Sequence, residues 1–278
     1  MKLLVIIGLQ KAATTSLHIQ LSQHVQIKSS LGLKDVDLFG KLYKGYQSVN
    51  DALKPFSKKN CYTLHTHVNY IMYEESLRRI IQQYSEVKVV VITRDPVDRA
   101  ISAYKYFRRK GIENRSMSDA LHYVPKKLNE ITECNDDNDN FTYIEHGFNS
   151  KLVSRAARIF GHENLYVLSY EDYTLNQQDE LQLLTKWLGI SAYVFKPVLS
   201  NQSGPPKFRF IKKMMDRRSR LKRIFRRTFI FVFGNEKYQT LKHKIFLWNI
   251  SSQKEMNMDS SKEEIEVRKY LTQRYENC

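Results

Sequence analysis

The sequence predicts an α/β fold in which helices flank a doubly wound, largely parallel sheet. Three short runs rich in aliphatic and β-branched residues, at 3–7, 87–93 and 165–169, predict the strands. Each run is apolar almost throughout, which is typical of parallel strands covered on both faces. Helical periodicity, and no hairpin turn, precedes or follows each run. The alternation of strand and helix therefore indicates a sheet built from crossover connections.

Two segments between these strands, and one after the last, have the spacing of helices. Segments 74–84 and 149–160 repeat apolar residues every three or four positions, as helices with one buried face do. A third helix is expected over 181–190 and closes near Gly189, because glycine adopts the left-handed conformation that ends many helices. The terminal residues 270–278 indicate a last helix.

The composition fits a globular protein with a large core. Hydrophobic residues make up 42% of the 278 residues, and Gly and Pro number only 10 and 6, which excludes a disordered or fibrous chain. At about 150 residues per domain, the length suits one or two domains. We expect a single domain over 1–278, in which an α/β core over 1–205 precedes a basic helical C-terminal extension over 206–278. The turn-forming residues 203–206 mark the boundary.

The charge and the cysteine content indicate the cellular compartment of the protein. Lys and Arg number 45 against 29 Asp and Glu, a formal net charge of +16. The first apolar run is too short to cross a membrane and has no signal-cleavage pattern. Cys61, Cys134 and Cys278 are odd in number and widely spaced, which favours a reducing compartment. We therefore expect a cytoplasmic protein.

The first predicted strand leads through a short loop straight into a helix. Such a turn directs backbone N–H groups and the positive end of the helix toward one point. Lys11 adds a full charge there, and Thr14, Thr15 and Ser16 add hydroxyl donors. The segment predicts a phosphate site, with an ordinary capped helix as the alternative. It departs from the pattern G-x-x-x-x-G-K-[ST], because Lys11 precedes the hydroxyl residues by three positions.

A second candidate segment follows the strand over 87–93. Asp95 suits an N-cap and Pro96 the first helical position, so the strand ends at Arg94 and a helix begins at once. Arg94 is then placed at the carboxyl edge of the sheet, where open α/β sheets bind ligands. Ser102 lies two turns into the helix, within reach of a group held by Arg94. The alternative is a structural Arg–Asp pair.

Together, the two segments resemble the sulfotransferases that use 3′-phosphoadenosine-5′-phosphosulfate (PAPS). That family has a loop of the form G-x-x-K-x-G/A-T-T-S/A-L and a segment R-D-P-x-x-R-x-x-S-x-Y, and the resemblance covers residues 1–205. It implies a P-loop-like fold and PAPS as co-substrate. No metal site is expected, because no candidate pair has further ligands at a suitable spacing. The residues that the resemblance assigns to the 5′-phosphosulfate are Lys11, Ala12, Ala13, Thr14, Thr15 and Ser16, and those for the 3′-phosphate are Arg94 and Ser102. Many relatives have Gly in place of Ala13, so a slightly reshaped loop is expected.

Sulfuryl transfer needs a base for the acceptor proton and a cation for the departing phosphate. Lys11 suits the second role. Asp35, in K-D-V-D-L-F, resembles the Glu base in the K-E-x-x-F-F segment of carbohydrate sulfotransferases related to the heparan-modifying enzymes. His67, in L-H-T-H-V, resembles the His base of the soluble small-molecule sulfotransferases. Both stay open as the base, and Asp35 is preferred.

The region after the predicted core is strongly basic. Residues 207–227 hold eleven Lys or Arg against one Asp, with apolar residues interleaved, and an apolar run over 229–233 follows. A solvated helix face explains such a run most simply. An anionic glycan or the phosphates of the donor would also fit it, and so would peripheral contact of 207–233 with an anionic membrane or polyanion. Nucleic acid is not expected, because no binding motif accompanies the charge.

The resemblance implies a sulfotransferase that moves a sulfuryl group from PAPS to a hydroxyl, with an amine as second choice. The expected partner is an acceptor substrate, a glycan or another hydroxyl compound. Three alternatives remain. One is a small-molecule (alcohol or phenol) sulfotransferase with His67 as base, the second is a P-loop-like kinase, and the third is a non-enzymatic basic adaptor.

Overall fold

The computed structural model describes residues 2–29, 35–40, 43–53, 61–122, 142–198 and 260–276. The chain divides into two compact units, one made of Met1–Val198 and Lys262–Cys278 and the other of Leu199–Ser261. The basic segment 207–233 and the boundary 203–206 lie outside the described residues, as do Cys134 and Cys278. A single domain over 1–278, with its core over 1–205 and its extension over 206–278, stays a prediction.

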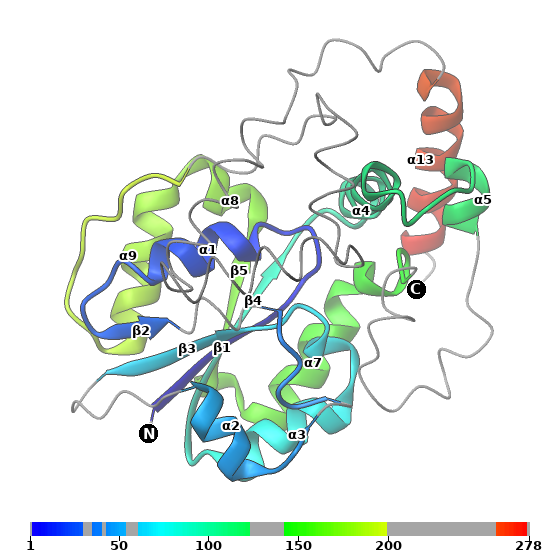
Figure 1. Cartoon of the computed structure of the whole chain (residues 1–278). Helices are drawn as coiled ribbons and strands as arrows, with labels where there is room; N and C mark the ends of the chain where they lie inside the picture. Colours follow the sequence, from blue (N-terminus) through cyan, green and yellow to red (C-terminus); the bar gives the residue numbers. More distant parts are fainter. Residues whose placement is uncertain are drawn as a thin grey trace, which may run out of the picture. The chain divides into compact units, whose positions relative to one another are not determined.

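The centre of the first unit is a sheet of five parallel strands in the order β2-β3-β1-β4-β5 (Figure 1). The strands are β1 (Lys2–Gly8), β2 (Ile27–Ser29), β3 (Tyr62–Thr66), β4 (Glu86–Thr93) and β5 (Leu165–Ser169). All three predicted strands are confirmed, and so is the α/β class with its parallel sheet. The strand order reverses beside β1, because the chain first builds β2 and β3 on one side and then β4 and β5 on the other. Ligands of open parallel sheets bind at the carboxyl ends of the strands at such a point.

The sequence patterns missed β2 and β3. β2 has only three residues, too few for any periodicity to show. β3 reads Y-T-L-H-T, and its Thr63, His65 and Thr66 are completely buried although they are polar. Apolar runs are the signal of a buried strand, so a central strand with polar residues inside the protein escaped it.

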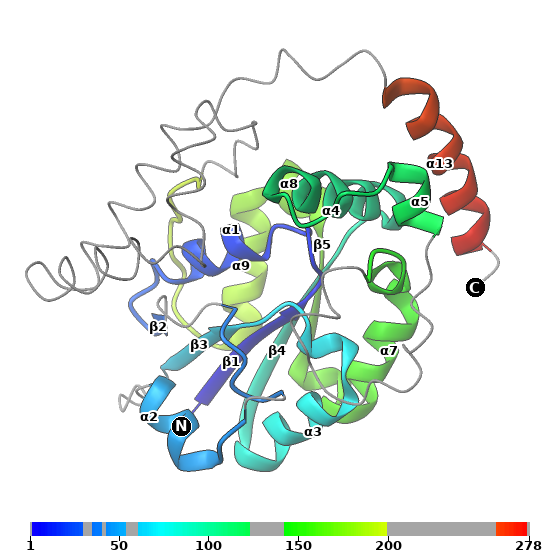
Figure 2. The ribbon, with the colours of Figure 1, turned by 45° about the vertical axis from the view of Figure 1, so that its right-hand side comes forward.

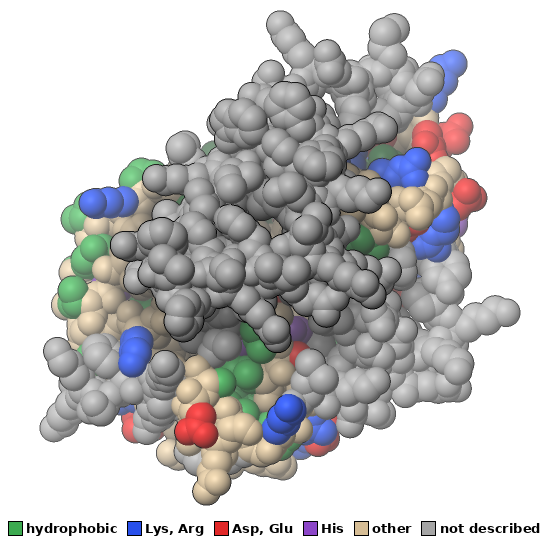
Figure 3. All heavy atoms as spheres, viewed as in Figure 1, with side chains coloured by type: hydrophobic (Ala, Val, Ile, Leu, Met, Phe, Trp, Pro, Cys, Tyr) green, Lys and Arg blue, Asp and Glu red, His purple; other side chains and the backbone are tan. Residues whose placement is uncertain are grey.

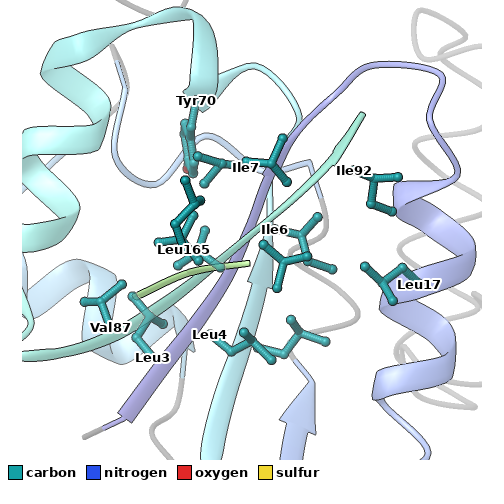
Figure 4. Packing of buried hydrophobic residues seen from close by; sticks show 14 of the residues in the cluster. Leu3, Leu4, Ile6, Ile7, Leu17, Tyr70, Val87, Ile92 and Leu165 are labelled. Carbon is teal, nitrogen blue, oxygen red and sulfur yellow. The ribbon is translucent and has the colours of Figure 1, made fainter. Parts of the chain in front are cut away.

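The sheet is covered on both faces. Figures 1 and 2 show α1 (Thr14–Leu21) and α9 (Gln177–Leu188) on one face, and α3 (Glu74–Gln83) and α7 (Asn149–Phe160) on the other. Every side chain from 3 to 7 in β1 is completely buried, as a strand with helices on both faces requires. Figure 4 shows the consequence, with Leu17 of α1 on one side of β1 and Tyr70 on the other. The predicted helices over 74–84, 149–160 and 181–190 are confirmed, with shifted ends.

Several shorter elements connect these layers. They are α2 (Tyr46–Leu53), α5 (Met117–His122), α8 (Tyr170–Leu175) and the 3₁₀ turns η2 (Tyr70–Met72), η4 (Glu145–Gly147) and η5 (His162–Asn164). The helix predicted after β4 is α4 (Pro96–Lys110), and the Asp95 carboxylate accepts a hydrogen bond from the Asp98 N–H at 2.8 Å. This cap ends β4 and starts α4 without a linker, as the sequence predicted.

A last helix, α13 (Ser260–Glu276), packs beside α4 and α5. It begins ten residues before the last helix that the sequence predicts over 270–278. Its Val267 and Leu271 are buried in a second apolar cluster with Phe107 of α4 and Leu121 of α5. Charged side chains of both signs cover this part of the surface (Figure 3). Ion pairs there contribute little, because exposed pairs are worth at most about 1 kcal/mol, so apolar burial holds α13 in place.

Arg99 is buried where α4, η4 and α13 meet. Its side chain is completely inaccessible, and its Nη2 donates to the Tyr143 carbonyl. Burial lowers the pKa of this guanidinium, although Tyr275 of α13 and the Glu145 carboxylate oppose that effect. The Tyr275 hydroxyl donates to the Ile144 carbonyl at 2.9 Å. Arg99, the second arginine of the R-D-P-x-x-R segment, therefore belongs to the packed interior.

None of the helices in the described ranges combines the length and the apolar character needed to cross a membrane.

We predict that Leu271→Ala lowers the free energy of unfolding by about 2–5 kcal/mol, because the lost methyl groups leave a cavity. Ile265 of the same helix is 62% exposed, so Ile265→Ala is the matched control and should cost no more than about 0.5 kcal/mol. Urea unfolding followed by circular dichroism measures both. Equal losses in the two variants would show that α13 does not dock in solution.

Candidate active site

The loop between β1 and α1 lies at the carboxyl edge of the sheet and turns back sharply. Lys11 and Ala13 both adopt left-handed backbone conformations, with φ of 66° and 60°. The Leu9 N–H donates to the Ile92 carbonyl of β4 at 2.9 Å, and the Leu17 N–H donates to the Ala13 carbonyl at 3.1 Å. Alternating left- and right-handed residues direct successive N–H groups toward one point, the geometry of an anion-binding loop.

Ala13 adopts a left-handed conformation, which glycine adopts without strain, although Ala13 has a Cβ. A left-handed conformation costs a residue with a Cβ about 1–2 kcal/mol, and Lys11 has the same cost. Such backbone strain persists where surrounding contacts impose it, and it gathers at functional sites. Ala12, between the two, is completely buried and fixes the loop to the core.

The first turn of α1 has none of the side chains that usually neutralise a helix N-terminus. Its N-cap is Ala13, which has no side-chain acceptor, and no acidic residue lies in the first turn. Among the described residues, α1 therefore lacks the side-chain cap that the alternative of an ordinary capped helix requires. Thr14 and Ser16 are buried, while Thr15 is half-buried. N–H groups that no described side chain caps, together with the positive helix end, favour a bound anion.

Arg94 joins the two candidate segments. Its Nη1 donates to the Lys11 carbonyl at 2.8 Å, and its guanidinium lies 4.3 Å from the centre of the Tyr170 ring. The Asn149 side chain donates to the Arg94 carbonyl at 2.9 Å. Within the described residues, these contacts engage one of the five N–H donors of the guanidinium. Arg94 is thus rigidly held beside the loop with donors left for a phosphate.

Ser102 lies on α4 and is half-buried. Its hydroxyl forms no hydrogen bond with another described residue. Its predicted role beside Arg94 therefore stays a prediction.

The two candidate bases lie at the same edge of the sheet. The Asp35 N–H donates to the Thr66 carbonyl at 2.9 Å. His67 directly follows Thr66 in the chain, and its N–H donates to the Ile6 carbonyl at 3.0 Å. Asp35 is exposed, whereas His67 is 2% exposed and stacks on the Tyr70 ring at 4.3 Å. In the described part of the chain, no three His, Cys, Asp or Glu side chains gather in a way that would hold a metal ion.

Tyr70 anchors the segment that carries Asp35. The Tyr70 hydroxyl accepts hydrogen bonds from the N–H groups of Leu38 and Phe39, at 2.7 and 3.1 Å. It also lies 3.2 Å from Nε2 of His65. One buried phenol therefore fixes residues 35–40 to the end of β3.

Sequence reasoning missed several residues of this site. Tyr106 makes a cation–π contact with Lys11, whose ammonium lies 4.2 Å from the centre of the Tyr106 ring. Its spacing of four from Ser102 places both on one face of α4, which was an available signal. Tyr170 directly follows β5 at the carboxyl edge, which was another. Asn149 and Tyr70 gave no signal, because their roles depend on contacts distant in sequence.

The parallel sheet, the strained loop and the open helix terminus define a P-loop-like α/β protein. A family model for the sulfotransferase domain matches residues 2–204. The chain belongs to this family, and the resemblance drawn from the two motifs is confirmed.

Two curated relatives agree with this assignment, and one solved structure has a similar fold. The chain is 25% identical over 187 residues to mouse heparan sulfate glucosamine 3-O-sulfotransferase 5 and 26% identical to the human protein. The match covers 67% of this chain and 53% of either relative, so the chain spans about half of their length. A sulfotransferase from Alicyclobacillus acidocaldarius has a similar fold, with a TM-score of 0.59 and 22% identity over 74% of this chain and 87% of that one.

We predict that Arg94→Ala weakens binding of adenosine 3′,5′-bisphosphate about ten- to one-hundred-fold, the scale of a lost charge-assisted hydrogen bond. Binding of adenosine 5′-monophosphate, which lacks the 3′-phosphate, should change far less. Titration calorimetry measures both. Arg158 is an exposed arginine on α7, and Arg158→Ala is the matched control. A variant that still prefers the bisphosphate as strongly as the wild type would refute the role of Arg94.

Proposed function

We propose that the chain is a PAPS-dependent sulfotransferase that transfers a sulfuryl group to an acceptor hydroxyl. The observation that carries this proposal is the β1–α1 loop. It combines two left-handed residues, a helix terminus without a side-chain cap and Lys11, and Arg94 joins it at 2.8 Å. Family membership supports the same reaction.

The loop and Arg94 suit the two anionic ends of the donor. In this proposal, the N–H groups at the start of α1 and the hydroxyl residues Thr14, Thr15 and Ser16 bind the 5′-phosphosulfate. Arg94, with Ser102, binds the 3′-phosphate. The Tyr170 ring and the Lys11 carbonyl limit the motion of Arg94, so little side-chain entropy is lost when the phosphate binds.

The transfer step is an in-line displacement at sulfur. The acceptor hydroxyl gives its proton to the base and forms the new O–S bond. The bond between sulfur and the 5′-phosphate oxygen breaks, and its electron pair stays on that oxygen. Lys11 would offset the charge that develops there, the type of electrostatic contact that contributes most to such reactions.

Asp35 is the better candidate for the base. It is exposed at the edge of the sheet, whereas the His67 ring is buried against Tyr70. A general base has to come within about 3 Å of the acceptor proton or reach it through a water. A buried, stacked imidazole suits a positioning role better.

A carbohydrate acceptor follows from the relatives and not from the geometry. The two curated relatives are named for a heparan sulfate glucosamine, and we extend that class to this chain as a proposal. A hydroxyl is preferred over an amine. A cytoplasmic location and contact of 207–233 with a polyanion or membrane stay predictions.

Thermal unfolding with adenosine 3′,5′-bisphosphate in the absence of magnesium tests the proposed function. At one hundred times its Kd, the product should stabilise the fold by about 2.7 kcal/mol and raise the Tm. A kinase would respond to ATP with magnesium, and an adaptor to neither nucleotide. No stabilisation by the bisphosphate, together with no transfer from radiolabelled PAPS to a panel of glycans and alcohols, would refute the proposal.

We predict that Lys11→Ala lowers kcat by about two to three orders of magnitude, as expected when one transition-state contact is lost. Binding of the bisphosphate product should weaken less. Lys186, an exposed lysine of α9, provides the control Lys186→Ala, with normal kcat. Near-normal turnover of Lys11→Ala would remove Lys11 from the mechanism.

We predict that Asp35→Asn abolishes turnover and leaves product binding intact, because the amide keeps the shape of the side chain but cannot accept the proton. His67→Gln should cost less and act on the acceptor KM. Initial rates at saturating donor and calorimetric product binding measure both. An inactive His67→Gln variant beside an active Asp35→Asn variant would assign the site to the small-molecule type.

A further inference from the structure

Two lysines from distant parts of the chain share one aromatic ring. The ammonium of Lys11, in the β1–α1 loop, lies 4.2 Å from the centre of the Tyr106 ring. The ammonium of Lys110, the last residue of α4, lies 4.3 Å from the same centre. Both distances fall well within the range of a cation–π contact. Tyr106 therefore connects the anion-binding loop to the far end of α4.

The Tyr106 ring rests on a rigid support. Tyr106 belongs to α4, and its ring packs edge-on against Phe107 at 5.2 Å. Phe107 is 4% exposed and contacts the buried Tyr143 ring at 6.0 Å. The ring that receives Lys11 is thus built onto the second apolar cluster, the same one that α13 covers.

A neutral ring suits the task that the proposed reaction gives Lys11. A free lysine side chain carries about 2 kcal/mol of rotamer entropy, so an unsupported ammonium samples many positions. The contact with the Tyr106 ring restricts the ammonium without adding a negative charge beside it.

We propose that Tyr106 is a positioning residue, whose ring holds the Lys11 ammonium at the β1–α1 loop in readiness for the donor phosphate. The proposal rests on the proposed sulfotransferase function. Lys110 shares the ring but lies at the end of α4, four residues beyond Tyr106, and takes no part in the transfer.

A spectroscopic experiment tests the contact without any turnover. In the full chain with ¹³C-labelled lysine, the ring current of Tyr106 should shift the Lys11 ε-methylene proton signal upfield, and the loss of that signal in Lys11→Ala assigns it. Tyr106→Phe should keep the shift, because the ring remains, and Tyr106→Leu should abolish it. A Lys11 signal without a shift in the wild type, or one unchanged in Tyr106→Leu, overturns the proposal.

Kinetics test the consequence. A cation–π contact of about 0.5–2 kcal/mol corresponds to a two- to thirty-fold loss, so Tyr106→Leu should lower kcat by that factor while the donor KM stays within about twofold. Tyr106→Phe should retain the wild-type kcat. In a Lys11→Ala background, Tyr106→Leu should have no further effect, because the contact is already lost. An equal loss in that background, or a rise of KM in place of the fall in kcat, overturns the positioning role.

Lys110→Gln separates the two lysines. It should change kcat less than twofold, and a loss as large as that of Tyr106→Leu would show that the ring serves Lys110 instead. Failure of the proposed function looks different, because the wild type itself would then neither bind the bisphosphate nor transfer a sulfuryl group from PAPS, while the ring-current shift of Lys11 would still be observed. Thermal unfolding of Tyr106→Phe and Tyr106→Leu confirms that the kinetics report on folded protein.

Discussion

Two hydrogen bonds tie the loop after β1 to the end of β4. The Leu9 N–H donates to the Ile92 carbonyl at 2.9 Å, and the Arg94 side chain donates to the Lys11 carbonyl at 2.8 Å. Together they hold a loop whose two left-handed residues carry a conformational cost of about 1–2 kcal/mol each. Without them, the N–H groups at the start of α1 would not converge. The site therefore depends on the adjacency of β1 and β4, which the reversal of strand order creates.

Polar side chains inside the protein organise the other half of the site. His18 of α1 lies 2.7 Å from the Thr66 hydroxyl and 2.7 Å from the Ser29 hydroxyl, so it joins α1 to both β3 and β2. Tyr70 holds the segment that carries Asp35. Buried polar groups are costly unless they are paired, and these pairings give the segment around Asp35 a fixed geometry.

The sequence predicted the parts that depend on local pattern. The apolar runs of β1, β4 and β5, the Asp95–Pro96 start of α4 and the glycine end of α9 all follow from short-range rules. β3 escaped because its buried Thr63 and His65 do not form an apolar run. Tyr70 and Asn149 escaped because their contacts join residues 32 and 55 positions apart. Long-range hydrogen bonds between polar groups produce no periodic pattern in the sequence, so only the structure shows where these residues lie.

The two arginines of R-D-P-x-x-R show how one motif can contain two different physical roles. Arg94 lies at the carboxyl edge of β4 beside the loop, whereas Arg99 is completely buried between α4 and η4. Spacing alone cannot assign these roles, because it places Arg94 just before α4 and Arg99 in its first turn but does not show which residues cover each side chain. α13, which lies beyond the 2–204 match to the family, closes over this region through Val267 and Leu271. The helix α4, which carries Ser102 and Tyr106, therefore packs partly against the matched domain and partly against α13, outside the match. Substitutions in α13 can thus change the position of α4 and, with it, the geometry of the site.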